Sequence, residues 1–111
     1  MIQSAEFWLP QTQTWMFEQL RAMPSEFENH VVCEVTQNLD QFPMPHIHCH
    51  ATLPRWRQLW DKRLRAIGLR PHLSHLPELA DELRAPILHS HFGNTGWIDR
   101  TVARRRGMRH V

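Results

Sequence analysis

The chain has 111 residues, of which 41% are hydrophobic and 22% are charged, and its formal net charge is +2 with histidine neutral. This length suits one domain, and the composition is that of a globular protein rather than of a disordered chain. The apolar stretches are too short to cross a bilayer, and the mild charge argues against a nucleic-acid binder.

The first half of the chain alternates between strand and helix patterns. In chain order we predict a strand at 2–9, a helix at 15–23, a strand at 29–36 and a short strand at 47–49. Pro10 ends the first strand and Pro24 ends the helix. We expect Thr12 or Thr14 to cap that helix, because a threonine hydroxyl accepts a hydrogen bond from a free amide of the first turn.

The second half continues the alternation. Here we predict helices at 56–67 and 76–83, a strand at 86–91, a helix that Asn94 or Thr95 caps, and a strand that opens at 109–111. Gly107 suits the position just after the last helix, where the backbone turns left-handed. This order predicts an α/β fold, a Rossmann-like, mostly parallel sheet with flanking helices and right-handed crossovers.

Two loops follow predicted strands at the edge where open α/β sheets bind ligands. The first is rich in amide and hydroxyl groups, which suit sugar hydroxyls or phosphate. The second leads into a helix N-terminus, which favours an anion. The candidate substrate-binding residues are Gln11, Thr12, Gln13 and Thr14 in the first loop, and His91, Phe92, Gly93, Asn94 and Thr95 in the second.

Histidine is the most frequent candidate metal ligand, with nine copies. His46, His48 and His50 alternate, so we expect their imidazoles on one face of a strand, with Cys49 on the other. Alternate side chains on one strand lie about 6.5–7 Å apart, which is poor for enclosing one ion. We therefore predict no metal and no cofactor, and we expect Cys33 and Cys49 to be reduced thiols.

Other common catalytic motifs are missing from the sequence. It contains no nucleophile elbow, no Walker loop and no dinucleotide-binding glycine fingerprint. The loop after the first strand in particular argues against a nicotinamide-dependent dehydrogenase. The catalytic residues therefore stay unassigned at this stage.

Three segments carry a resemblance to a known family. The chain resembles the N-terminal domain of family-4 (group 1) GT-B glycosyltransferases at these places. Residues 7–15 with 18–20 are similar to that domain's first strand, its loop and the helix that follows. Residues 87–93 are similar to its fourth strand, and residues 104–111 to its helix end and next strand. Gln-Thr-Gln-Thr-Trp at 11–15 and His-Ser-His-Phe-Gly at 89–93 are its specific parts. Two features depart from the family: Arg109 replaces a proline, and Pro10 to Gln13 replace a glycine-rich loop.

The resemblance implies a function for a longer parent enzyme. Such an enzyme transfers a sugar from a nucleotide-sugar donor to a glycan or lipid-linked acceptor, retaining the anomeric configuration without a bound metal. Residues 1–111 would be a partial N-terminal, acceptor-side domain of a protein of polysaccharide biosynthesis. The C-terminal donor domain would be absent, and the fragment alone inactive. The alternative from a different class is a stand-alone flavodoxin-like binding module, with metal bound through histidines.

The arginines gather in two groups, residues 55–70 and residues 100–109. They are either solvated helix faces or contacts to anionic lipid or phosphate groups. With the family resemblance, this pattern predicts a cytoplasmic protein with peripheral contact at the inner membrane face. Unpaired sheet edges in a truncated domain further predict self-association.

Overall fold

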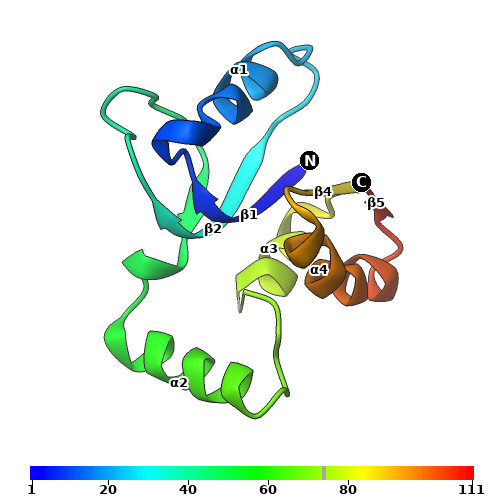
Figure 1. Cartoon of the computed structure of the whole chain (residues 1–111). Coiled ribbons are helices and arrows are strands. Elements are labelled where there is room, and N and C mark those ends of the chain that lie inside the picture. Colours follow the sequence, from blue (N-terminus) through cyan, green and yellow to red (C-terminus); the bar gives the residue numbers. More distant parts are fainter. Residues whose placement is uncertain (74) are drawn as a thin grey trace.

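A computed structural model describes residues 1–73 and 75–111. The chain forms a five-stranded, all-parallel sheet with strand order β3-β2-β1-β4-β5, flanked by helices (Figure 1). The α/β, Rossmann-like fold predicted from the sequence is therefore confirmed. The strands are β1 (Ile2–Trp8), β2 (His30–Thr36), β3 (Ile47–Cys49), β4 (Ile87–Ser90) and β5 (Arg109–His110). The helices are α1 (Trp15–Arg21), α2 (Arg55–Ala66), α3 (His75–Leu83) and α4 (Gly93–Arg105), with short 3₁₀ helices η1 (Gln11–Gln13) and η2 (His50–Thr52).

The sheet has an apolar core on each face, because successive strand residues point to opposite sides. Val31 packs on the face that α1 covers, together with Met16 and Leu20 of that helix. The neighbouring Val32 packs on the other face, where the core residues from α3 and α4 include Leu76 and Val102. β1 lies in the centre and is buried on both faces over its first half. The two cores fix the central strands and therefore fix where their carboxyl ends lie.

The helix boundaries agree with the sequence prediction better than the caps do. Thr14 precedes α1, but its side chain makes no capping hydrogen bond. α4 begins at Gly93, at least two residues earlier than predicted, so Asn94 and Thr95 lie inside its first turn. The residue before α4 is Phe92, with a φ of 72°, and it makes no side-chain cap either. The prediction that threonine or asparagine caps these helices is wrong, whereas Gly107, with a φ of 63°, is confirmed as the left-handed residue after α4.

The three histidines around β3 do not all lie in one extended strand, as the sequence predicted. His46 precedes the strand with a φ of 57°, and His50 follows it in η2. His48 is therefore the one of the three that lies within β3. The side chain of His50 donates a hydrogen bond from Nε2 to the Asp61 carboxylate at 3.1 Å. A left-handed residue before the strand and a tight helix after it break the alternation that the prediction assumed.

Helix α2 stands away from the rest of the molecule in Figure 1. Of its residues only Asp61 is buried, while Trp56 and Trp60 are 70% and 57% exposed. Polar contacts connect it to the body, chiefly the buried His50–Asp61 pair and the Arg65–Glu34 ion pair. The space beneath α2 is therefore not filled by a hydrophobic core. Among the described residues, no helix is long and apolar enough to span a bilayer.

Candidate functional site

The sheet has a topological switch point between β1 and β4. These strands are parallel neighbours, yet β1 continues into α1 on one face and β4 into α4 on the other. Where two neighbouring connections diverge in this way, an open α/β sheet leaves a crevice at the carboxyl ends of its strands. The two loops predicted from the sequence to bind substrate follow these two strands.

A cavity of about 220 Å³ lies at this edge, on the face that α4 covers. Asn94 and Thr95 of the predicted site line it, at the N-terminal end of α4. Its other walls come from β1, β2, α2, the segment before α3 and the interior of α4: Ser4, Ala5, Glu6, Glu34, Arg65, Pro71, His72, Leu73, Ile98 and Asp99. The structure thus places two predicted residues in a pocket with polar groups that are distant in sequence.

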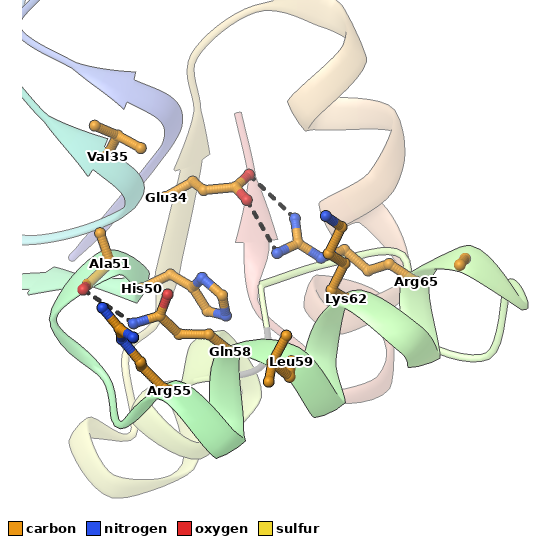
Figure 2. Close-up of a pocket in the computed structure, with 10 residues that line it drawn as sticks. Glu34, Val35, His50, Ala51, Arg55, Gln58, Leu59, Lys62 and Arg65 are labelled. Atoms are coloured by element: carbon orange, nitrogen blue, oxygen red, sulfur yellow. Dashed lines mark hydrogen bonds and ion pairs between the residues drawn. The ribbon is translucent and has the colours of Figure 1, made fainter.

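A second, larger cavity of about 900 Å³ adjoins the first beneath α2 (Figure 2). Side chains of α2 form one wall, and the end of β2 with η2 forms the other: Arg55, Gln58, Leu59, Lys62, Arg65 and Ala66 against Glu34, Val35, His50 and Ala51. Glu34 and Arg65 border both cavities. We call the two cavities together the α2 cleft.

The Arg65–Glu34 pair divides the α2 cleft. Two parallel hydrogen bonds of 3.1 Å join the guanidinium to the two carboxylate oxygens, which Figure 2 draws as dashed lines. This bidentate geometry is the strong form of an ion pair. Arg55 and Lys62 have no carboxylate partner within the described chain, so their charges face the larger cavity uncompensated. The larger cavity therefore has an excess of positive charge, which favours anions.

The N-terminus of α4 offers a second place for an anion, at the smaller cavity. The helix has 13 residues, and its first turn contains no acidic side chain. Free amide groups at a helix N-terminus carry a partial positive charge and bind phosphate readily. A Cβ atom added to Gly93 would meet no other heavy atom within 4 Å, so the backbone here is open to an approaching ligand. Asn94 and Thr95 supply side-chain donors beside it.

Asp99 is the buried carboxyl group of the smaller cavity. It is 2% exposed, and burial is the main cause that raises its pKa, partly offset by hydrogen bonds such as the one from Ser90. Ser90 Oγ donates to Asp99 at 3.0 Å and accepts from His110 Nε2 at 2.9 Å. This order differs from a catalytic triad, where the carboxylate orients the histidine and the histidine activates the serine. The arrangement suits a proton-holding carboxyl group rather than a serine nucleophile.

His91 is buried beneath the crevice. Its side chain donates from Nε2 to the amide oxygen of Gln3 at 3.1 Å, and its ring packs edge-on against Trp8 and Trp15. Burial, with a smaller effect of His89, lowers the pKa of His91 to about 4. The ring is therefore neutral at pH 7, and its contact with Trp15 joins the two predicted loops. Phe92 beside it is 49% exposed.

The first predicted loop lies at the same edge but outside the cavities. Gln11 and Thr12 are exposed on η1, and Gln13 and Thr14 are half-buried. The amide oxygen of Gln13 is buried and has no hydrogen-bond partner among the described residues. The walls of both cavities are therefore built by other segments.

Sequence reasoning missed the walls that come from β2 and α2. Glu34 lies in a strand that reads as core, and Lys62 and Arg65 read as a solvated helix face. The signal available was the mixed pattern of α2, which carries both large aromatic and basic side chains. Comparisons with protein families, with curated proteins and with solved structures give no match to this chain.

Proposed function

We propose that this chain is the acceptor-side domain of a retaining glycosyltransferase that transfers a sugar from a nucleotide-sugar donor to a glycan or lipid-linked acceptor. One observation supports this most. The predicted residues Asn94 and Thr95 line a cavity with several polar groups at the switch point of a Rossmann-like sheet, next to a larger cationic cavity. The donor domain would belong to a longer polypeptide or to a second chain.

The chemistry of the α2 cleft suits a phosphorylated, hydroxyl-rich ligand. Arg55 and Lys62 would pair with phosphate oxygens of a lipid-linked acceptor, helped by the N-terminus of α4. Asn94, Thr95 and Asp99 offer donors and acceptors for sugar hydroxyls. These groups bind and orient substrate, which is the contribution expected of an acceptor-side domain.

Binding of soluble acceptor mimics tests the proposal. We expect geranyl diphosphate, and octyl β-glucoside below its micelle-forming concentration, to shift the NMR amide signals of Asn94 and Thr95 in ¹⁵N-labelled protein. The Lys62→Ala variant should bind geranyl diphosphate several-fold more weakly, because it lacks a phosphate contact. Arg104→Ala, on the exposed side of α4, is the matched control.

The outcomes discriminate between the two candidate functions. If neither mimic shifts these signals, the acceptor-side proposal fails. Preferential binding of flavin mononucleotide would instead favour the stand-alone flavodoxin-like module.

The isolated 111 residues should not transfer sugar, since the proposed donor site lies outside them. Incubation of the purified chain with radiolabelled nucleotide sugars and octyl β-glucoside checks this. Product formation above a protein-free control would contradict the assignment to an acceptor-side half.

We further propose that α2 contacts the inner face of an anionic membrane. Trp56, Trp60 and Ile67 follow helical spacing and are 70%, 57% and 65% exposed, on a side of α2 that does not line the cleft. The exposed Arg63 lies on the same stripe. Exposed tryptophan next to basic residues is typical of helices that lie in a membrane interface.

Co-sedimentation with vesicles tests this contact. We expect binding to phosphatidylglycerol vesicles at low salt, weaker binding at high salt because charges are screened, and loss in the double variant Trp56→Gln, Trp60→Gln. Trp97→Gln removes an equally exposed tryptophan from α4 and is the control. Equal binding to neutral phosphatidylcholine vesicles would contradict an electrostatic contact.

A further inference from the structure

Three potential metal ligands meet at the amino edge of the sheet, opposite the α2 cleft. They are Glu28 before β2, His30 at its first position and His46 before β3. Their ligand atoms all lie within 4.8 Å of one another. The ligands come from two segments that meet at the sheet edge, so the spacing problem of a single strand, on which the sequence prediction of no metal rested, does not arise.

The distances in this cluster suit a small metal ion. Glu28 Oε1 lies 3.5 Å from His30 Nε2 and 3.6 Å from His46 Nε2. Ligand atoms that surround a tetrahedral Zn²⁺ at about 2.0–2.1 Å are separated from each other by roughly 3.3 Å. The observed separations are close to this value, so a modest rearrangement of exposed side chains would complete the coordination.

One ring nitrogen of His30 is buried and lacks a hydrogen-bond partner among the described residues. The residue is 7% exposed, and its Nε2 is buried without a hydrogen-bond partner among the described residues. A buried ring nitrogen without a partner is costly unless something binds it. Nε2 faces Glu28 and belongs to the group of three ligand atoms. A metal ion would satisfy this nitrogen.

The other nitrogen of His30 has the partner that a metal-bound histidine needs. Nδ1 lies 3.2 Å from Nε2 of His48, and the two rings are stacked. When Nδ1 carries the proton and donates to His48, the lone pair of Nε2 is free to bind a cation. Such an outer hydrogen bond commonly fixes the tautomer and the orientation of a ligating histidine.

The backbone holds the two histidines in place independently of any metal. His30 donates its amide to Met1 O at 3.0 Å, and Val31 donates to His46 O at 3.0 Å. The two ligand-bearing backbones are thus joined by sheet hydrogen bonds. The ring of His46 stacks on that of His30 with centroids 4.7 Å apart. The site is preorganised on its histidine side, and the exposed Glu28 is the adjustable ligand.

We propose that Glu28, His30 and His46 form a Zn²⁺ site with at least one position open to water. Two imidazoles and a carboxylate are a ligand set that zinc accepts, and the two exposed ligands, Glu28 and His46, leave room for solvent. The ion would join the start of β2 to the start of β3. This site is independent of the proposed glycosyltransferase function, because it lies at the opposite edge of the sheet.

Metal titration of the full chain, made without a polyhistidine tag, tests the site. We expect one Zn²⁺ per chain by isothermal titration calorimetry. At about 100 times the dissociation constant, Zn²⁺ should raise the Tm by on the order of 10 °C. Co²⁺ should give the visible absorption of a four- or five-coordinate ion. The variants His46→Gln and Glu28→Gln alter exposed ligands, so they should fold and bind Zn²⁺ at least tenfold more weakly.

Glu26→Gln is the matched control, since it removes an exposed carboxylate two residues from Glu28. It should bind Zn²⁺ as the unaltered chain does. The proposal is overturned if the unaltered chain takes up no Zn²⁺, or if its affinity is the same in His46→Gln, Glu28→Gln and the control. Either result would leave the acceptor-mimic experiments unaffected.

Discussion

Phe92 has a backbone conformation that residues other than glycine rarely adopt. Its φ of 72° and ψ of 144° lie where a Cβ atom is crowded, and such strain costs on the order of 1–3 kcal/mol. The residue joins β4 to α4, between the buried His91 and the open backbone of Gly93. This strained residue directly precedes the first turn of α4, whose Asn94 and Thr95 line the smaller cavity.

Two substitutions of Phe92 distinguish the effect of backbone strain on stability from the effect of losing the aromatic ring. Phe92→Ala loses the ring but keeps Cβ, whereas Phe92→Gly loses both. We expect Phe92→Gly to be more stable than Phe92→Ala by about 1 kcal/mol, although glycine ordinarily costs about 0.5–1 kcal/mol of backbone entropy. Urea unfolding of the two variants measures the difference. An alanine variant that is the more stable of the two would show that Phe92 is not strained.

The buried His91 should make stability depend on pH. Its pKa falls from 6.5 to about 4 on folding, mainly through burial, so the unfolded chain binds more protons between these values. The contribution of neutral His91 to the free energy of unfolding is therefore complete above pH 6.5. It is lost as the pH falls toward 4, and the loss amounts to about 3 kcal/mol.

Urea unfolding of the unaltered chain and of His91→Asn at several pH values checks this dependence. Asparagine still offers an N–H donor but does not titrate in this range. Other histidines whose pKa is lowered, such as His75, remain in both proteins. The variant should therefore lose part of the slope, not all of it. Identical slopes would mean that His91 is protonated at little cost in the folded chain.

At the scale of elements, α2 differs from the other helices in what holds it. α1, α3 and α4 each bury apolar residues against the sheet, but α2 buries only Asp61. Its apolar side chains were predicted to mark an amphipathic helix, and the helix is present. Periodicity established that the segment is helical, but it could not tell whether the apolar stripe meets the core or faces solvent. Hence the cleft beneath α2 was beyond prediction.

The Arg65–Glu34 pair should control how firmly α2 sits over the cleft. Both side chains are partly exposed, 27% and 34%, so we expect a coupling of only about 0.5–1 kcal/mol in a double-mutant cycle of Arg65→Met and Glu34→Gln. The clearer result should be local. Amide hydrogen exchange in α2 should speed up while exchange in α3 stays unchanged, because few other contacts hold α2. Arg63→Met, on the exposed side, is the control, and equal acceleration there would contradict a tether.

The same contrast explains which parts of the binding site the sequence revealed. Loops after β1 and β4 are recognisable, because strand ends and helix starts carry turn residues such as Pro10 and Gly93. The partners that these loops meet depend on strand order, which local patterns do not specify. His30 illustrates the limit: it reads as an ordinary strand residue, and only the pairing of β2 with β3 brings it to His46 and His48.

As a whole, the molecule exposes more surface than its mass predicts. Its accessible surface is 7178 Å², against roughly 6,500 Å² expected for a monomer of this size. The detached α2 accounts for part of the excess, and the sheet edges add unpaired backbone groups. β3 and β5 are the edges, with three and two residues, and β5 ends next to Val111, which is 62% exposed. Short edges limit pairing with another chain but do not prevent it.

We predict weak self-association through the β5 edge, since its outer side pairs with no other described strand. Size-exclusion chromatography with light scattering should show an apparent mass that rises above 13.3 kDa with concentration. Val111→Lys should reduce this rise, because a charge beside an edge strand opposes pairing. Leu69→Lys, which adds the same charge at a residue 74% exposed near α2, should not. If Leu69→Lys alone reduces the rise, association proceeds through the α2 side. A constant monomer mass at every concentration would contradict self-association altogether.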